Sequence, residues 1–281
     1  MIDTRMYASV NEALACISLE LIQADAVDVI NAVGDKVVTH EIANFHAMFK
    51  PGYNNVCTLP LRKFPYKGAQ AEFLWYMTGK ADANAVAKYL PNWLNYADVN
   101  GCVNSNYGVY WHKYIPGIIE ELKRDKSSRR ACMNIYHAGN ADKFNKDTPC
   151  TLSLQFLIRN DKLCLICTMR SNDIWYGFSI DQFCNSLLQQ LVLHSLQQVY
   201  PNLQLGWYAH NTGSMHVYMS ESKGNSNISG QTLFELYTQY MTSNDAGKAF
   251  TIPDEVSFDN FWSIDNVVFD AERYNYFKSV Q

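Results

Sequence analysis

Two apolar segments, residues 151–158 and 163–169, are the feature that most restricts how this chain can fold. Both are short and rich in apolar and β-branched residues, a composition typical of strands. Asn160-Asp161 lies between them and favours a tight antiparallel turn. A long helix is predicted over residues 181–200, where apolar side chains recur every three or four positions.

The pattern on either side of the hairpin predicts an α+β layered domain. Residues 131–137, 206–211 and 215–219 are further predicted strands, and residues 69–77 form a predicted helix that stops at Gly79. Strands therefore concentrate in the middle of the chain, with helices before and after them, which disfavours a doubly wound sheet. The absence of a Gly-rich phosphate loop after a strand argues against Rossmann and P-loop folds.

Composition allows one large domain or two small ones, and the lack of a linker favours a single domain over residues 1–281. The sequence is 48% hydrophobic, which suffices for a sizeable core, and shows neither an internal repeat nor a Pro/Gly/Ser linker. Residues 224–230 are rich in Gly, Ser and Asn and predict a surface loop. The net charge is −4 and no long basic stretch occurs, so we expect no direct nucleic-acid partner.

The termini and cysteines predict a cytoplasmic protein without a membrane partner. The N-terminus lacks a secretion signal, and the apolar residues 13–22 include Glu20 and are too short to span a bilayer. Eight cysteines without such a signal indicate reduced thiols. Cys164 and Cys167 form a CxxC inside a predicted strand, and because no second ligand pair accompanies them we expect no metal.

Cys150 and Arg170 are the first candidates for chemistry. Thr148-Pro149-Cys150 precedes a predicted strand, which places the thiol at an element end where a substrate can reach it; the alternative is a small buried side chain. Arg170 would favour the thiolate and so lower the pKa of the thiol. Arg170-Ser171 combines a planar fork with a short hydroxyl donor, which suits a phosphate monoester. The structural alternative for Arg170 is a salt bridge across a dimer interface.

The order of these residues resembles the thymidylate synthase superfamily. The likeness rests on Pro149-Cys150-Thr151, on Arg170-Ser171-Asn172-Asp173, and on Gly177 and Asp181 after them, and it extends over about residues 10–220. Where the synthases carry an asparagine that recognises uracil, this chain has Asp181, as in the phage deoxycytidylate hydroxymethylase branch. The resemblance implies a large mixed β-sheet covered by helices, with a sheet face that forms a homodimer interface.

The resemblance also implies four catalytic residues. The Cys150 thiolate would attack C6 of the pyrimidine and turn C5 into a nucleophile. Glu72 would transfer protons around the C4 group, and Tyr107 would hydrogen-bond into the same network. Asp181 would accept from the exocyclic amine of cytosine and, when protonated, donate to N3. The structural alternatives are a solvated helix position for Glu72 and a helix N-cap for Asp181.

Phosphate binding is the second implied role. Arg170 and Ser171 would bind the nucleotide phosphate, and Arg129 with Arg130 would arrive from the partner subunit, so that the homodimer is functionally necessary. The synthases place a further arginine in an N-terminal loop that is absent from residues 31–36. Either Lys36 replaces it or three arginines suffice.

The remaining implied residues contact the sugar and the folate. His216 and Tyr218 match the pair that recognises the sugar hydroxyl. Asp173, Trp93 and Arg62 would contact the co-substrate 5,10-methylenetetrahydrofolate. The implied partners are therefore a pyrimidine nucleoside monophosphate, a folate and a second copy of the chain.

The product depends on whether water reaches the intermediate. Thr151, Asn172 and Asn104-Ser105-Asn106 resemble the hydroxymethylases, which favours 5-hydroxymethyl-dCMP and tetrahydrofolate. If Trp93, Tyr96 and the C-terminal tail exclude water, hydride transfer gives a 5-methyl product and dihydrofolate instead. The sequence also leaves open that CMP replaces dCMP as the substrate, or that the chain is a nucleotide-binding dimer without catalysis.

Overall fold

A computed structural model describes residues 6–31, 34–137, 147–219, 228–243, 245–263 and 268–281. The chain divides into two compact units. The first unit comprises residues 1–64, 167–183 and 207–250, and the second comprises residues 65–166, 184–206 and 251–281.

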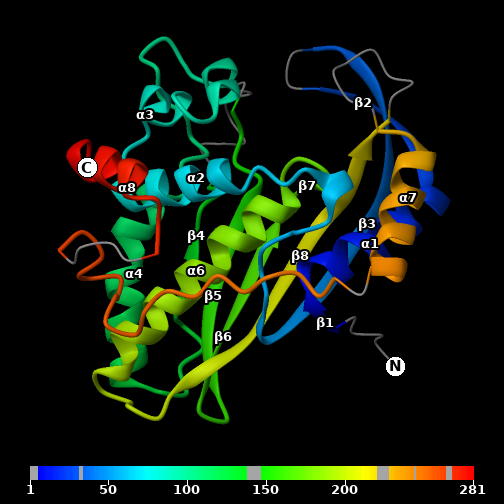
Figure 1. The fold of residues 1–281 in the computed structure, drawn as a ribbon. Coiled ribbons are helices and arrows are strands. Elements are labelled where there is room, and N and C mark those ends of the chain that lie inside the picture. Colours follow the sequence, from blue (N-terminus) through cyan, green and yellow to red (C-terminus); the bar gives the residue numbers. More distant parts are fainter. Residues whose placement is uncertain (1–5, 32–33, 138–146, 220–227, 244, 264–267) are drawn as a thin grey trace. The chain divides into compact units, whose positions relative to one another are not determined.

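Each unit combines strands and helices (Figure 1). The first contains β1 (Met6–Ser9), α1 (Val10–Gln23), β2 (Asp25–Ile30), β3 (Lys36–Asn54), η1 (Pro60–Arg62), β7 (Asn172–Asp173) and α7 (Gly230–Ser243). The second contains α2 (Tyr66–Thr78), α3 (Ala83–Ala87), η2 (Pro91–Asn95), α4 (Gly108–Arg124), β4 (Cys132–Asn134), β5 (Thr151–Arg159) and α8 (Ala271–Ser279). Three elements have residues in both units: β6 (Lys162–Met169), α6 (Phe178–Gln197) and β8 (Gln204–Tyr218).

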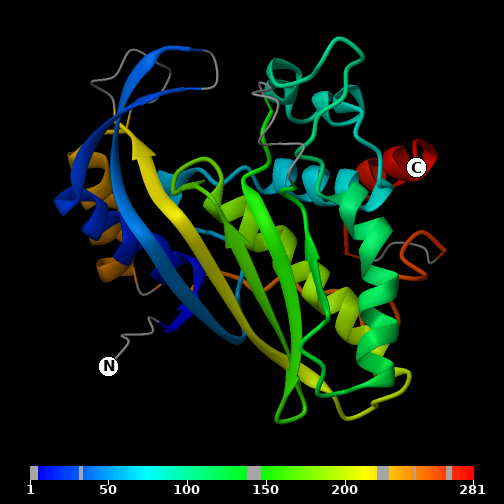
Figure 2. The same ribbon diagram turned by 180° about the vertical axis from the view of Figure 1, so that it is seen from behind.

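The strands form a mixed sheet, as predicted. Their order is β1-β3-β8-β6-β5-β4, with β2 paired to β3 and β7 paired to β8. β1–β3 and β7–β8 are parallel, whereas β2–β3, β3–β8 and β4–β5 are antiparallel. Figure 2 shows β3 and β8 running side by side in the first unit. The homodimer interface on a sheet face stays a prediction.

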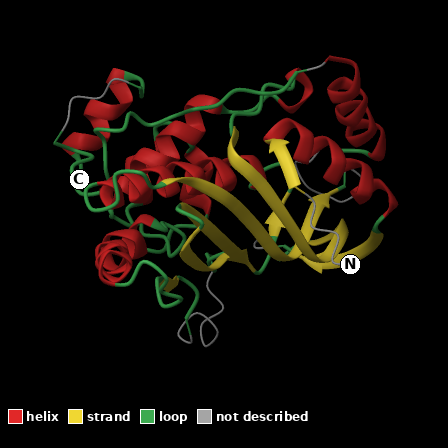
Figure 3. Cartoon of the chain, turned by 90° about the horizontal axis from the view of Figure 1, so that it is seen from below, coloured by secondary structure: helices red, strands yellow, loops and turns green. Residues whose placement is uncertain are grey.

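The core of the first unit is built on β3. Phe49 and Tyr208 face each other from β3 and β8 with ring centroids 5.8 Å apart, and Tyr53 stacks on Tyr208. α1 packs against β3, and α7 packs against α1 (Figure 3). The hydroxyl of Ser9 caps α1 by accepting from the backbone N–H of Glu12 at 3.0 Å, which supplies a partner to an otherwise unpaired donor.

The core of the second unit is built on α2. Every residue of this helix from Gly68 to Thr78 is buried, and the helix ends at Gly79, which is left-handed with φ 66°. The predicted helix and its stop are thus confirmed. At Gly108 a Cβ atom would lie 1.7 Å from the carbonyl oxygen of Tyr76, so only glycine allows α4 to begin this close to α2.

The hairpin prediction is confirmed, and the strand after it differs. Asn160 and Asp161 have φ of 51° and 55°, the left-handed pair that a two-residue hairpin turn requires. Residues 206–211 and 215–219, predicted as two strands, belong to the single strand β8. Pairing with β3 on both sides of Gly213 carries β8 through the predicted break.

The long helix begins three residues earlier than predicted. α6 starts at Phe178 because Asp173 organises the turn before it, where its Oδ1 accepts from the backbone N–H groups of Trp175 and Tyr176 at 2.7 and 2.6 Å. Asp181 therefore lies in the first turn and is not the N-cap.

Candidate active site

The predicted site residues fall into two groups, one in each unit. The first unit contains Arg62, Arg170, Ser171, Asp173, Asp181, His216 and Tyr218, and the second contains Glu72, Trp93, Tyr107, Arg129, Arg130 and Cys150. Within each group the structure brings together residues that are far apart in sequence.

β7 assembles the group in the first unit. It pairs in parallel with β8 so that Asp173 lies opposite His216. Just before β7, the guanidinium of Arg170 donates to the hydroxyl of Ser171 at 3.0 Å. A Cβ atom at Gly213 would lie 2.8 Å from the carbonyl oxygen of Arg170, so glycine permits this approach of β8. Arg170 and Ser171 thus form the paired donor set expected of a phosphate clamp.

Asp173 and Arg62 have buried polar atoms that suit a polar heterocycle. Oδ2 of Asp173 and Nε of Arg62 are buried and lack a hydrogen-bond partner among the described residues. Burial raises the pKa of the Asp173 carboxyl, with His216 and Arg62 opposing, and burial lowers the pKa of the Arg62 guanidinium. That guanidinium lies 5.4 Å from the centroid of the Trp175 ring, a cation–π contact. The pair offers an acceptor and a donor to a bound ligand, which fits the predicted folate contacts.

His216 and Tyr218 lie on the same face of β8. Their rings meet edge to face with centroids 5.2 Å apart. The Ser214 hydroxyl lies 3.4 Å from Nδ1 of His216 and donates to the carboxylate of Glu41 at 2.6 Å. Glu41 pairs directly with His216 across β3 and β8. The side chains of Ser214 and Glu41 therefore orient His216, a support that the sequence did not reveal.

Asp181 is held by a chain of buried polar groups that sequence reasoning missed. Its Oδ2 accepts from Nδ2 of Asn172 at 2.6 Å, and Oδ1 of Asn172 lies 3.1 Å from Nε2 of His210. Nδ1 of His210 lies 2.7 Å from the hydroxyl of Tyr208. Burial lowers the pKa of His210 to about 3. The available signal was that Tyr208 and His210 stand two residues apart, on one face of an apolar strand.

Cys150 is the centre of the group in the second unit. Its half-buried thiol lies directly before β5, at the element end that was predicted. The next residue, Thr151, donates its backbone N–H to the hydroxyl of Tyr107 at 3.3 Å. Burial raises the pKa of the Tyr96 hydroxyl, and the charges of Cys150 and Asp147 raise it further. Tyr107 therefore bonds to the backbone next to the nucleophile, and Tyr96 lies close enough to Cys150 to feel its charge.

Asp147 anchors the segment that leads into Cys150, and its role was not predicted. Its carboxylate accepts from the backbone N–H of Ser105 at 2.7 Å and also from the Ser105 hydroxyl. Its carbonyl accepts from the side chain of Asn104 at 3.0 Å. Asn106 donates to the carbonyl of Lys80 at 2.7 Å. The segment 104–106, singled out from sequence, therefore supports the cysteine loop.

Glu72 is buried, which rules out the solvated position considered from sequence. It is 7% exposed and accepts a hydrogen bond from the Tyr76 hydroxyl at 2.7 Å. Burial raises the pKa of its carboxyl, while hydrogen bonds from Tyr76 and Trp93 oppose the shift. Trp93 also packs edge to face on Trp75 with centroids 5.2 Å apart. A carboxyl with a raised pKa keeps its proton to higher pH than an exposed glutamate does, which suits a general acid.

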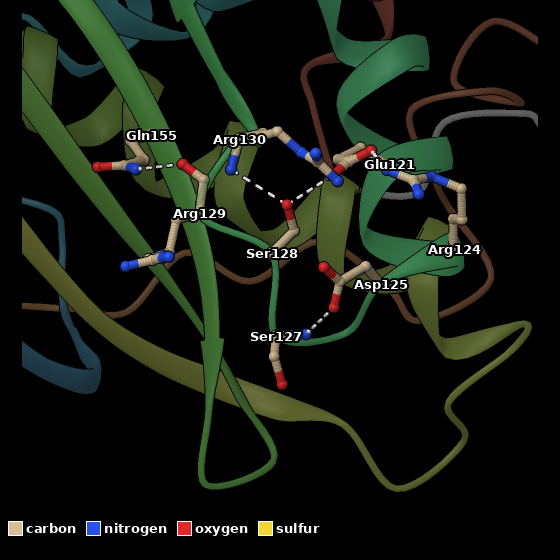
Figure 4. Close-up of polar contacts among 8 residues, drawn as sticks. All are labelled: Glu121, Arg124, Asp125, Ser127, Ser128, Arg129, Arg130 and Gln155. Carbon is tan, nitrogen blue, oxygen red and sulfur yellow. Dashed lines mark hydrogen bonds and ion pairs between the residues drawn. The ribbon is translucent and has the colours of Figure 1, made fainter.

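Arg129 and Arg130 were predicted as a pair, and the structure gives them different surroundings (Figure 4). Nε of Arg130 donates to Glu121 at 3.0 Å, and Arg124 and Ser128 bind the same carboxylate. The side chain of Arg129 points away from this cluster (Figure 4) and forms no ion pair within the described residues. Of these two arginines, Arg129 is therefore the one without a carboxylate partner in the described part of the chain.

The other predictions concern Lys36, metals and membranes. Lys36 forms an exposed ion pair with Asp28 at 2.7 Å, and residues 32–33 of the same loop lie outside the described residues, as do residues 224–227 of the predicted surface loop. Cys164 and Cys167 are buried in β6. Across the described ranges, no group of three or more His, Cys, Asp or Glu side chains could hold a metal ion. No helix within those ranges is long and apolar enough to cross a membrane.

Comparison with known proteins gives a consistent result. A family model described as thymidylate synthase matches residues 27–251. The chain is 30% identical over 168 residues to the deoxyuridylate hydroxymethyltransferase of Bacillus phage SP01, an alignment that covers 54% of this chain and 43% of that protein. The chain thus spans less than half the length of this curated relative. The fold is similar to that of thermostable thymidylate synthase A from Bacillus subtilis, with a TM-score of 0.66 and 21% identity over 90% of this chain and 92% of the other.

Proposed function

This chain belongs to the thymidylate synthase family, and we propose on that premise that it transfers a one-carbon unit from 5,10-methylenetetrahydrofolate to C5 of a pyrimidine nucleotide. The substrate we propose is dCMP, and the product is 5-hydroxymethyl-dCMP. The observation that carries this choice is the carboxylate of Asp181, which is held by Asn172 at 2.6 Å in the first turn of α6.

The reaction starts at Cys150. Its thiolate adds to C6 of the base, and the electron pair of the C5–C6 bond becomes available at C5. C5 then forms the new carbon–carbon bond to the methylene carbon of the co-substrate. Loss of the C5 proton, with cleavage of the carbon–nitrogen bond and release of tetrahydrofolate, leaves an exocyclic methylene group on the nucleotide. Water adds to this group, and the C6–sulfur bond breaks to restore the aromatic base and the thiolate. The hydrogen bond from Thr151 to Tyr107 fixes the backbone beside the nucleophile.

Glu72 supplies the proton transfers that the sequence of additions and eliminations needs. Its buried carboxyl has a raised pKa and is oriented by Tyr76 and Trp93. It keeps its proton to higher pH than an exposed glutamate does and is suited to exchange that proton with the C4 group of the base. An exposed glutamate with an ordinary pKa would stay ionised and could not act as the acid.

The folate, when bound, supplies the methylene carbon. We propose that Asp173 and Arg62 bind its polar ring atoms, since each keeps a buried polar atom without a hydrogen-bond partner among the described residues. Trp93, which is half-buried beside Trp75, supplies an aromatic surface for the reactive end. Leaving a buried donor or acceptor unpaired costs about 1–3 kcal/mol, so a ligand that pairs both is favoured.

We propose that the phosphate is bound by Arg170 and Ser171 together with Arg129 and Arg130 from a second subunit of a homodimer. His216 and Tyr218 bind the sugar hydroxyl. A mixture of Cys150→Ser and Arg129→Ala subunits tests the dimer, because a mixed dimer joins an intact thiol to an intact arginine. Activity of the mixture well above either parent supports the donation, and no gain excludes it.

Both compact units take part in this reaction, so we propose that residues 1–281 act as one catalytic domain. The thiol, Glu72 and Tyr107 belong to the second unit, and the groups for base, phosphate and sugar recognition belong largely to the first.

Asp181 supports cytosine over uracil by its hydrogen-bonding capacity. Cytosine presents an amine donor at C4 and a bare N3, and a carboxyl group can accept from the first and donate to the second. Uracil presents an oxygen at C4, which a carboxylate cannot satisfy. A mismatch of this kind costs about 1–3 kcal/mol, or roughly 5- to 150-fold in kcat/KM.

A second candidate substrate is dUMP. It is favoured by the name of the phage relative, a deoxyuridylate hydroxymethyltransferase, which is 30% identical over the aligned part. Two further variants of the reaction follow from the same chemistry. Hydride transfer in place of water addition gives a 5-methyl product and dihydrofolate, and CMP in place of dCMP changes only the sugar.

Mass spectrometry of the products from dCMP, CMP and dUMP, each with methylenetetrahydrofolate, decides among these reactions. We expect dCMP to gain CH2O. A gain of CH2 with formation of dihydrofolate identifies a methylase, and turnover of dUMP alone overturns the assignment of Asp181. Cys150→Ser must be inactive, and Asp181→Asn must move the preference toward dUMP. Tight nucleotide binding without release of the C5 proton would indicate a binding protein.

A further inference from the structure

A buried polar chain in the first unit ends at the base-recognition carboxylate. Tyr208 and His210 of β8 are fully buried, and Asn172 of β7 is 4% exposed. The chain runs from the Tyr208 hydroxyl to His210 at 2.7 Å, from His210 to Asn172 at 3.1 Å, and from Asn172 to Asp181 at 2.6 Å. Only its last member, Asp181, is partly exposed.

The neighbouring residues leave room for this chain of hydrogen bonds and shield it from solvent. A Cβ atom at Gly177 would lie 2.9 Å from Nδ2 of Asn172 and 3.1 Å from Oδ2 of Asp181, so a side chain there would push apart the two groups that touch. The ring of Phe178 covers His210 edge to face, with centroids 5.1 Å apart. Solvent is thereby kept from the histidine, and burial lowers its pKa to about 3. His210 is therefore a neutral imidazole with one N–H.

Two hydrogen-bond directions fit a neutral imidazole at these distances. In the forward direction Tyr208 donates to Nδ1, the Nε2–H of His210 donates to Oδ1 of Asn172, and Nδ2 of Asn172 donates to an ionised Asp181. In the reverse direction the Asn172 amide is turned over, so that its oxygen accepts from a protonated Oδ2 of Asp181 and its nitrogen donates to Nε2 of His210, whose Nδ1–H donates to Tyr208. The short 2.6 Å contact and the partial exposure of Asp181 favour the forward direction, because charge-assisted hydrogen bonds are the shorter ones.

We propose that His210 is a positioning residue that acts through Asn172 to keep Oδ2 of Asp181 an acceptor. Oδ1 is then the oxygen that carries the proton when the carboxyl group donates to the base. A carboxylate oxygen has two lone pairs, so Oδ2 can accept from Asn172 and from a base amine together. It cannot donate to a base oxygen. The inference rests on the proposed role of Asp181 in base recognition, and it assigns the source of the selectivity to a histidine that never touches the nucleotide.

The direction of the chain is open to a test that needs no activity. In protein labelled with ¹⁵N-histidine, NMR distinguishes Nε2–H from Nδ1–H, and loss of one signal in His210→Gln assigns it among the seven histidines. We expect the Nε2–H form for His210. The Nδ1–H form would mean that the hydrogen bonds run in reverse and would overturn the inference, even in a protein without activity.

The functional test compares substitutions that remove or keep the donor. His210→Phe removes both ring nitrogens, whereas the amide of His210→Gln can still donate to Asn172 from near the position of Nε2. We expect the ratio of kcat/KM for dCMP over dUMP to fall about tenfold in His210→Phe, the size of one lost hydrogen bond. His210→Gln should retain most of the ratio. The ratio should fall less in Tyr208→Phe, because this change removes only the hydroxyl group that donates to Nδ1 and so favours the Nε2–H tautomer of His210.

His194→Phe is the matched control. This histidine is also buried, and its Nδ1 lies 2.7 Å from the backbone carbonyl of Val256 in the second unit. That hydrogen bond involves none of the four residues of the polar chain. We expect it to lose stability without a change in the ratio. Equal losses for dCMP and dUMP in His210→Phe would show a purely structural role and overturn the inference.

Binding separates failure of the inference from failure of the proposed function. The same dCMP to dUMP ratio is measured as dissociation constants by calorimetry. If the wild type turns over neither nucleotide, or only dUMP, the proposed reaction is wrong. The change in the ratio of dissociation constants still tests the role of His210. An unchanged binding ratio in His210→Phe would overturn the inference whatever the reaction.

Discussion

Glu72 in α2 and Glu121 in α4 are glutamates on two helices of the second unit, and their surroundings move their pKa values in opposite directions. Burial raises the pKa of the Glu72 carboxyl against the hydrogen bonds from Tyr76 and Trp93. The pKa of Glu121 falls to about 2 because Ser128 and two arginines donate to its carboxylate at the surface. A hydroxyl donor is common to both sites, so solvent and charge decide the difference. The interior suits proton transfer, whereas the surface suits a fixed charge.

The largest expected effect is loss of activity in Glu72→Gln. The amide keeps an acceptor for the Tyr76 hydroxyl but cannot transfer a proton, so we expect kcat to fall roughly 10²- to 10⁴-fold. Steady-state kinetics with the preferred nucleotide measures it. Glu120→Gln is the control, since Glu120 is an exposed α4 glutamate paired to Lys123 at 3.0 Å. Activity of Glu72→Gln within a few-fold of the wild type would contradict this role for Glu72, because the raised pKa of the buried carboxyl would then have no chemical consequence.

The next effect concerns the two adjacent arginines. Arg130 is held by Glu121 at 3.0 Å, and Arg129 points away from that carboxylate (Figure 4). A lost hydrogen bond to a charged group costs about 1.5–3 kcal/mol, so we expect Arg129→Ala to raise the KM for the nucleotide by at least about tenfold. Arg130→Ala should raise it less. A larger effect of Arg130→Ala would show that the nucleotide competes successfully with Glu121.

Local patterns were enough to predict the elements around these sites. The helix that carries Glu72 followed from apolar spacing and the stop at Gly79, and the hairpin followed from Asn160-Asp161. The start of α6 could not be predicted in this way. It depends on the Asp173 carboxylate, which binds the backbone N–H groups of the two residues before Gly177 and draws the first turn forward.

The residues that support the candidate site could not be predicted from local sequence patterns, for a related reason. Asp147 contacts Ser105 across 42 residues of sequence, and His210 contacts Asn172 across 38. No spacing rule connects such pairs, because the sheet and the loops decide which side chains meet. Adjacency in sequence likewise did not reveal that, of Arg129 and Arg130, only Arg130 pairs with Glu121 among the described residues. Resemblance suggested which residues have chemical roles, and only the structure located the residues that contact them.

A smaller effect concerns the pH dependence of stability, which should have opposite signs for Glu72 and Glu121. A carboxyl with a raised folded-state pKa stabilises the protein less as pH rises above its unfolded value of 4.5, since the unfolded chain then releases the proton more readily. Glu72→Gln has no such proton to lose. We therefore expect it to gain stability relative to the wild type as pH rises above 4.5, in urea unfolding at a series of pH values. A difference that is constant with pH would indicate that Glu72 is not perturbed by burial.

The smallest effect should be that of Glu121→Gln, with the opposite dependence. The pKa of Glu121 falls from 4.5 to about 2 on folding, so its contribution is fully present above pH 4.5 and disappears as pH falls toward 2. The wild type should be the more stable protein at neutral pH, and the two proteins should converge in acid. Because Arg130 and Arg124 are exposed partners, salt should also shrink the difference, as it does for surface ion pairs. A difference that survives both acid and high salt would mean that Glu121 acts through packing, and the contrast with Glu72 would then be one of position and not of charge.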